Sequence, residues 1–143
     1  MDILGIMQIG ASALKAQTIR MNVISSNLAN METTRTPEGG PYQKKSVVFT
    51  TKSSSFEQEL ANSTRFQAKG VQVERVATDK REGKVVYDPA HPDADEQGYV
   101  EKPNVSLAEE MADMMKAKGS YAANVTTIKA AQRMAMKAIE IGR

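Results

Sequence analysis

The chain has 143 residues, room for one ordinary domain, and its 41% hydrophobic and 25% charged residues exclude wholesale disorder. The absence of cysteine excludes disulfide scaffolds, cysteine-based zinc sites, iron–sulfur clusters and thiol nucleophiles. The net charge is only +2, and no segment carries the dense basic field that nucleic-acid binding requires.

The N-terminus, Met1 to Met7, lacks the basic region and small-residue cleavage site of a secretory signal. We therefore expect no cleaved signal peptide. The apolar stretches of the chain are each a few residues long, far short of the roughly 18 that cross a bilayer.

Residues 3–29 form the first predicted helix. Its apolar residues recur at intervals of seven, at Met7, Leu14, Met21 and Leu28. A second column is partly polar: Ile3, Leu4, Gly10, Ala11, Gln17, Thr18, Ile24 and Ser25. This narrow seam is typical of a coiled coil. Asn27 and Asn30 tolerate the left-handed conformation in which many helices end.

The middle of the chain, residues 31–103, has a different pattern. It contains all five prolines, and alternation replaces the seven-residue period. Residues 45–51 are rich in β-branched side chains, and residues 71–74 and 84–87 read as two further short strands. Residues 79–83 are a plausible hairpin loop between these last two strands. The segment is therefore predicted to be a small β-rich insert with long loops.

Residues 107–141 form the second predicted helix. Ser106 and Glu109 have the spacing of a capping box, in which the two side chains satisfy the first backbone donors of a helix. A column at intervals of seven follows (Leu107, Met114, Tyr121, Ile128 and Ala135), accompanied by Met111, Lys118, Val125, Gln132 and Ile139. Such a helix would be roughly 50 Å long. It would protrude from a compact globule of this size, about 35–40 Å across.

The predicted fold class is α+β. Residues 1–30 and 104–143 would form a helical, coiled-coil-like domain, with the two helices paired antiparallel, and residues 31–103 the β-rich insert. Neither helix can bury its seam alone. We expect helix packing and assembly to rest on Met7, Leu14, Met21, Leu28, Leu107, Met111, Met114, Tyr121, Val125, Ile128 and Ile139. The methionines at 111, 114 and 115 suit either an adaptable partner-binding face or ordinary helix packing.

The most chemistry-like stretch is residues 88–98, with one histidine and several carboxylates. Counted from Asp93, it matches an EF-hand calcium loop through Gly98, but position 12 is Asn104 in place of the bidentate glutamate. A proline-rich turn loop is the better interpretation. Motifs for nucleophilic, metal-dependent and phosphate-loop catalysis are absent from the sequence. We therefore expect no enzyme activity, no cofactor and no metal.

Several motifs together resemble a known family, the axial rod and hook proteins of the bacterial flagellum. The first is Asn27, Leu28, Ala29 and Asn30, continued by Thr34, Arg35, Thr36, Pro37, Glu38, Gly39, Gly40, Pro41 and Tyr42. The second contains Asp88 and Pro89 with His91, Pro92 and Asp93. Further matches are Gly98-Tyr99-Val100, Pro103-Asn104-Val105 and Tyr121-x-Ala123-Asn124. The resemblance spans essentially the whole chain and is closest to the proximal-rod proteins.

This resemblance implies a structural subunit of the flagellar basal-body rod, a hollow periplasmic shaft that transmits torque and passes exported subunits. It implies export through the flagellar type III apparatus and a channel wall formed by the paired terminal helices. The implied partners are other copies of the chain, other proximal-rod proteins, the adaptor at the export gate and membrane ring, and the distal rod. The alternatives from other classes are a calcium-binding module and a helical adaptor outside the flagellum.

Overall fold

The computed structural model describes residues 3–51 and 69–142. Its elements run in the order α1 (Ile3–Ala29), β1 (Lys45–Thr51), β2 (Val71–Thr78), β3 (Lys84–Tyr87), β4 (Tyr99–Lys102) and α3 (Leu107–Ile141). Paired terminal helices around a small β-rich insert confirm the predicted α+β fold class. The segment 52–68 of the predicted insert lies outside the described residues.

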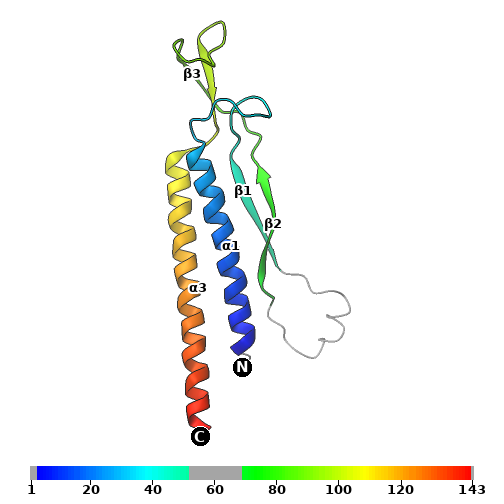
Figure 1. Cartoon of the computed structure of the whole chain (residues 1–143), viewed down its shortest axis with the longest axis vertical. Helices are drawn as coiled ribbons and strands as arrows, with labels where there is room; N and C mark the ends of the chain where they lie inside the picture. Colours follow the sequence, from blue (N-terminus) through cyan, green and yellow to red (C-terminus); the bar gives the residue numbers. More distant parts are fainter. Residues whose placement is uncertain (1–2, 52–68, 143) are drawn as a thin grey trace, which may run out of the picture.

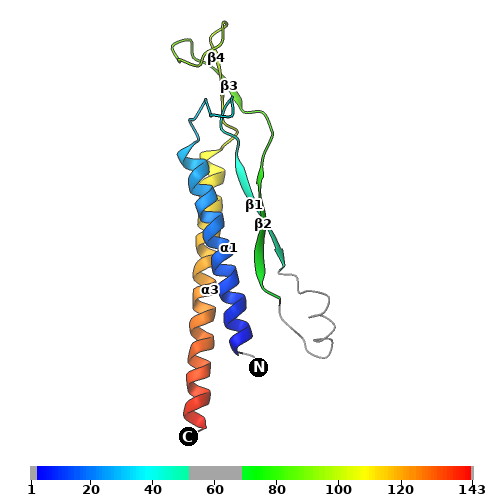
Figure 2. The same ribbon diagram turned by 45° about the vertical axis from the view of Figure 1, so that its right-hand side comes forward.

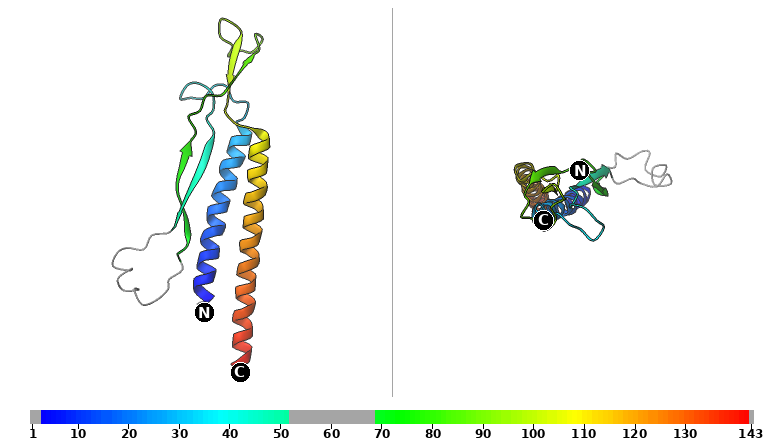
Figure 3. Two further views of the ribbon diagram at one scale, coloured as in Figure 1. Left: turned by 180° about the vertical axis from the view of Figure 1, so that it is seen from behind. Right: turned by 90° about the horizontal axis from the view of Figure 1, so that it is seen from above.

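The two helices lie side by side and antiparallel, and α3 overhangs the end of its partner (Figure 1). The bounds of α1 match the predicted 3–29. Because α3 has 35 residues against 27 in α1, its C-terminal turns run past the start of α1 (Figure 3). The molecule is therefore elongated. Among the residues that the structure describes, neither helix is apolar over a length that would cross a membrane.

The seam between the helices consists mainly of small residues. On α1 the buried positions include Gly10 and Ile24, and on α3 they include Ala117 and Ala131. A Cβ atom added at Gly10 would lie 2.7 Å from Cγ1 of Ile128, so the helices approach closely there. The lack of a side chain at Gly10 permits this approach, and Ile128 fills the space beside it.

The predicted helix columns are only partly inside this seam. Met7, Leu14, Met21, Leu28, Met114, Tyr121, Val125 and Ile128 are half-buried. Leu107, Met111 and Ile139 are exposed, at 48%, 52% and 70%, and do not pack within the chain. The buried residues of α3 (Glu110, Ala117 and Ala131) begin three residues after Leu107. The column expected from the sequence begins at Met111, four residues after Leu107. The role of the three exposed residues in assembly stays a prediction.

The insert contains two separate antiparallel ribbons. β1 pairs with β2, with Lys45 opposite Thr78 and Thr51 opposite Val71, and α1 lies between this ribbon and α3 (Figure 1). The register shifts between Val48 and Phe49, as in a β-bulge. β3 pairs with β4, and this second ribbon with its loop forms the end of the molecule farthest from the C-terminus (Figures 1 and 2).

The predicted hairpin between residues 71–74 and 84–87 is wrong. β2 takes β1 as its partner, and β3 takes β4, a strand that the sequence analysis did not predict. The long β-branched run of β1 gives β2 seven paired positions, whereas the four-residue β3 could offer fewer. At Gly83 the chain crosses close to β4, since an added Cβ would lie 1.7 Å from the carbonyl oxygen of Lys102.

Candidate assembly site: a buried polar joint

Side chains from three distant motifs meet where the helices join the insert. Asn27 lies near the end of α1, Tyr42 and Lys44 lie just before β1, and Asn104 and Glu110 flank the start of α3. We call these five residues the polar joint. Asn27 and Glu110 are each 1% exposed, so the joint has a buried centre.

Asn27 is the hub of the joint. Its Oδ1 accepts hydrogen bonds from the hydroxyl of Tyr42 and the backbone N–H of Lys45, both at 3.0 Å. Its Nδ2 donates to the carbonyl oxygen of Lys45 at 2.8 Å and to Oε2 of Glu110 at 2.9 Å. An amide offers two acceptor sites and two donors. All four are used, so Asn27 joins α1, β1 and α3 without an unpaired polar atom.

Glu110 and Lys44 form the charged part of the joint. Nζ of Lys44 lies 2.8 Å from Oε1 of Glu110 and 3.3 Å from Oε2 of Glu109. Burial lowers the pKa of Lys44, but the hydrogen bonds and negative charges of Glu110 and Glu109 outweigh it and leave the pKa above its ordinary value. Both carboxylate oxygens of Glu110 are therefore paired, which a buried charge requires.

Asn104 extends the joint to the connection between the ribbons. Its Oδ1 accepts the backbone N–H of Lys44 at 2.8 Å. Its Nδ2 donates to the carbonyl oxygens of Asp79 and Arg81 at 3.2 and 3.1 Å. One side chain thus ties the segment before α3 to the start of β1 and to the turn between β2 and β3.

The loop before Tyr42 closes on itself. The N–H of Tyr42 donates to the carbonyl oxygen of Thr33 at 3.0 Å, and the N–H of Thr36 donates to that of Gly40 at 2.9 Å. Gly39 and Gly40 have φ angles of 92° and 74°, a conformation that favours glycine. The Gly-Gly pair of the motif is therefore required by the turn that delivers Tyr42 to the joint.

The second motif lies in the loop between β3 and β4 and is tied to the first. Oδ2 of Asp93 accepts a hydrogen bond from the hydroxyl of Thr34 at 2.7 Å, and Oδ1 lies 3.9 Å from the Arg35 guanidinium. Nδ1 of His91 accepts the N–H of Asp93 at 3.1 Å. The exposure of the other motif residues varies: Leu28 and Pro41 are half-buried, and Ala29, Pro37, Glu38, Asp88, Pro89 and Pro92 are exposed.

At the ends of the two helices, the contacts differ from those that the sequence patterns suggested. No non-glycine residue of the described chain has a positive φ, so neither Asn27 nor Asn30 adopts the left-handed conformation. Asn30 instead donates from Nδ2 to the carbonyl oxygen of Ser26 at 2.8 Å. Ser106 is the N-cap residue of α3, but its side chain makes no capping hydrogen bond with the described residues. Glu109, the other half of the expected capping box, is turned toward Lys44.

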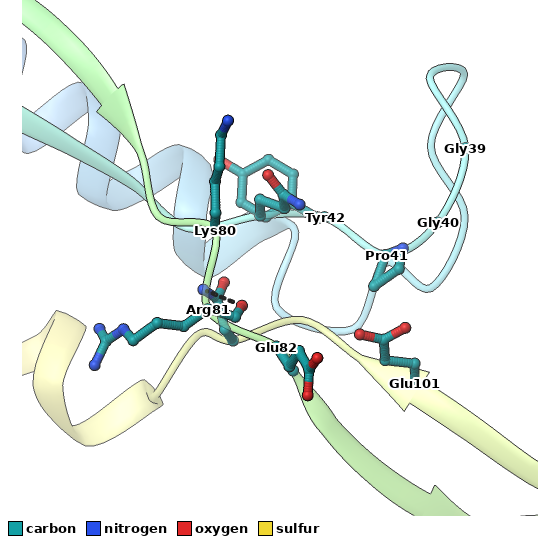
Figure 4. Close-up of a pocket in the computed structure, with 11 residues that line it drawn as sticks. Gly39, Gly40, Pro41, Tyr42, Lys80, Arg81, Glu82 and Glu101 are labelled. Carbon is teal, nitrogen blue, oxygen red and sulfur yellow. Dashed lines mark hydrogen bonds between the residues drawn. The ribbon is translucent and has the colours of Figure 1, made fainter.

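A shallow hollow lies beside the joint, between the 39–43 segment and the 80–83 turn (Figure 4). Lys80, Glu82 and Glu101 line it, with Tyr42 at its inner side. Hydrogen bonds from Arg81 hold the pKa of Asp79 below its ordinary value at the neighbouring turn. The hollow is open and charged, unlike the mostly apolar concave sites that hold small molecules.

Asp88 and Asp95 accept backbone N–H groups in and beside the 88–98 loop, whereas Asp93 accepts from Thr34 outside it. Oδ1 of Asp95 accepts the N–H groups of Gln97 and Tyr99 at 2.9 and 2.8 Å. Across residues 3–51 and 69–142, no three histidine, aspartate or glutamate side chains are grouped as metal ligands would be. The loop geometry therefore accounts for these aspartates as turn-forming residues.

Sequence reasoning found some joint residues and missed others. Asn27 and Tyr42 were singled out by their motif, and Asn104 by a further match. Lys44 and Glu110 were not among the predicted site residues. A lysine two residues after a tyrosine is an ordinary pattern, and only the fold brings Lys44 to the buried carboxylate.

Comparison with known proteins covers both ends of the chain. Residues 7–35 match the family described as flagella basal body rod protein, and residues 96–141 match the C-terminal family of flagellar basal body rod FlgEFG proteins. The flagellar basal-body rod protein FlgC of Bacillus subtilis (strain 168) is 44% identical over 96% of both chains. FlgC of Borreliella burgdorferi is 38% identical over 99% of this chain and 98% of its own, and FlgC of Escherichia coli O157:H7 is 38% identical over the whole of both.

The chain belongs to the FlgC family of flagellar basal-body rod proteins. It is a structural subunit of the rod, as the resemblance implied. The matches give no support to a calcium-binding module or a helical adaptor outside the flagellum. The N-terminal segment that matches a family model contains Asn27 of the joint, and the C-terminal segment contains Asn104 and Glu110.

Proposed function

We propose that this FlgC chain is a non-enzymatic subunit of the proximal rod, where it helps to form a hollow periplasmic shaft that transmits torque and passes exported subunits. The observation that carries the proposal is the 44% identity to a FlgC protein over 96% of both chains. The absence of recognisable catalytic motifs from the sequence agrees with a purely structural role.

The helix pair supplies the assembling surface in this proposal. Leu107, Met111 and Met115 are exposed on the first turns of α3, and more large apolar side chains are exposed near its end. Contiguous apolar surface of this kind marks an interaction site. Lateral neighbours in a helical lattice would cover it, since heterologous contacts that do not close generate open tubes.

The polar joint supplies stiffness. A shaft transmits torque only if each subunit holds its insert at a fixed angle to its helices. Asn27 and Asn104 each bond to segments that are distant in sequence, and the Lys44–Glu110 pair bridges the start of β1 to α3. Bending at this point would break several buried hydrogen bonds together, which makes the joint rigid.

The partners and the route to the rod follow from the family. We propose that the neighbours are other copies of the chain, other proximal-rod proteins, the adaptor at the export gate and membrane ring, and the distal rod. Export would use the flagellar type III apparatus without a cleaved signal peptide.

Deletion and complementation in the flagellated bacterium that encodes the chain test the function. The deletion strain should not swim, and its purified basal bodies should lack a complete rod. The wild-type gene should restore both. Ile128→Asp should be exported but fail to restore the rod, because it places a charge in the helix seam beside Gly10. Thr127→Asp, at an exposed neighbouring position, is the control. Complete rods in the deletion strain would reject the proposal.

A further inference from the structure

The β1–β2 ribbon meets α1 at a second polar contact, far from the polar joint. The hydroxyl of Ser12, in the first half of α1, donates a hydrogen bond to the carbonyl oxygen of Ile9 at 2.7 Å. A hydroxyl that donates in this way still has lone pairs for an outside donor. Oγ of Ser12 accepts the backbone N–H of Val71, the first residue of β2, at 3.0 Å. The hydroxyl therefore connects α1 to the end of the ribbon that the polar joint does not reach.

Gly70, which precedes β2, lies directly against this hydroxyl. A Cβ atom added at Gly70 would lie 2.7 Å from Oγ and 3.2 Å from Cβ of Ser12. The φ angle of Gly70 is not positive, so glycine is needed here for space and not for backbone conformation. Gly119 on α3 is the opposite case, since nothing lies within 4 Å of a Cβ added there. The close approach at Gly70 therefore belongs to the contact between the ribbon and α1.

The two polar contacts hold the ribbon at both of its ends. At the joint, Asn27 bonds to both the N–H and the carbonyl oxygen of Lys45, the first residue of β1. Ser12 and Asn27 are 15 residues apart on α1, about 22 Å at the helical rise of about 1.5 Å per residue. The seven residues of β1 span about 20 Å, and its last residue is opposite Val71. The ribbon therefore matches in length the stretch of α1 along which it lies (Figure 1).

We propose that Ser12 is a positioning residue that fixes the far end of the ribbon on α1, and that Gly70 lets the ribbon come close enough to be fixed. Both strands pack against α1, but apolar contact is not directional, whereas a hydrogen bond fixes the distance and direction between its atoms. A ribbon held at two separated points cannot pivot about the joint. The inference deepens the proposed function and rests on it, because a rod subunit must present its ribbon to neighbouring subunits in one position.

Hydrogen exchange of the Val71 amide in the purified full chain, followed by NMR, tests the contact. Ser12→Ala removes the acceptor and should speed this exchange by about fivefold, the usual effect of one lost hydrogen bond. Gly70→Ala should do the same, because the added Cβ must push away either the ribbon or the hydroxyl. The double variant should exchange no faster than either single variant, since all three lose the same bond. Gly119→Ala is the matched control and should leave the rate unchanged. The amide of Lys45, held at the joint, should keep its rate in every variant.

A distance measurement shows whether the ribbon itself moves. Because the chain has no cysteine, spin labels can be attached through Lys15→Cys on α1 and Gln72→Cys on β2, two exposed positions. The distance between the labels should be narrowly distributed in the otherwise unchanged chain and broader in Ser12→Ala and Gly70→Ala.

Two results would overturn the proposal. One is unaltered Val71 exchange or label distances in the two variants, and the other is an unsubstituted chain in which the Val71 amide exchanges as fast as in an unfolded peptide. Complete rods in the deletion strain would reject the rod function and leave these measurements as they are, so the two failures are distinguishable.

Discussion

A single amide does the most to connect the parts of this molecule. Asn27 uses all four of its hydrogen-bonding positions to hold α1, β1 and α3 together at a buried point. The sequence analysis placed Asn27 in a family motif and at the end of a helix, where an asparagine tolerates the left-handed conformation. It did not indicate that the side chain joins three elements. The partner Glu110 lies 83 positions away, and nothing local to either residue indicates that they meet.

We predict that Asn27→Asp destabilises the chain by at least about 3 kcal/mol, because it sets a second carboxylate against the buried Glu110. Chemical denaturation of the purified chain at neutral pH measures this loss. Asn22→Asp, at an exposed position on the same helix, should change stability little. Equal effects of the two variants would contradict the role of the joint.

We predict a second large effect at Lys44. Lys44→Met leaves Glu110 buried without its cation and should cost about 3 kcal/mol. Because the pKa of Lys44 is raised above its ordinary value in the folded chain, its contribution is present at neutral pH and is lost only as the pH rises through that raised pKa. Lys102→Met, which breaks a pair with the exposed Glu32, should cost less than about 1 kcal/mol. Denaturation midpoints that fall equally for both variants would count against a buried ion pair.

Among the elements, the helices were predictable and the pairing of the strands was not. The seven-residue period of Met7, Leu14 and Met21 arises within the helix, so the sequence locates α1 directly. The face of α3 that packs against α1 is the one whose residues are small enough to let the helices approach, such as Ala117 and Ala131. The seven-residue period alone does not indicate this face. Strand pairing in the insert depends on contacts between distant segments, which short alternating patterns do not specify.

The seam contains one polar acceptor that the chain leaves unpaired. Oε1 of Gln17 is buried and has no hydrogen-bond partner among the described residues. Gln17 lies seven residues from both Gly10 and Ile24, on the same face of α1. A buried unsatisfied acceptor costs about 1–3 kcal/mol.

Gln17→Leu should therefore raise the free energy of unfolding by about 1 kcal/mol, because it removes that acceptor from the seam. Thermal denaturation followed by circular dichroism measures the change. Gln8→Leu, at an exposed position of α1, should have almost no effect. A destabilised Gln17→Leu chain would show that the amide is needed where it lies.

At the scale of the whole molecule, the chain has little interior. The buried hydrophobic residues of the described part are Ala16, Ile24, Tyr42, Val100, Ala117 and Ala131, three of them alanine. The sequence indicated this indirectly, since a helix of roughly 50 Å cannot fit within a compact globule of this length.

The overhang of α3 should be the least stable part of the unassembled chain. Residues 132–141 are exposed except for the half-buried Ala135, and an unpacked helical segment is marginal in water. We expect their amides to exchange with deuterium much faster than those of residues 113–128. The difference should disappear in purified basal bodies, where neighbours cover the overhang. Fast exchange that persists in the basal body would mean that this surface stays uncovered.

Electron cryomicroscopy of basal bodies from the bacterium that encodes this chain tests the central claim most directly. We predict rod density into which the antiparallel α1–α3 pair fits, with the insert at the angle set by the polar joint and with neighbouring subunits covering the exposed apolar residues of α3. A rod in which this chain has no density, or in which its helices are separated from each other, would contradict the account.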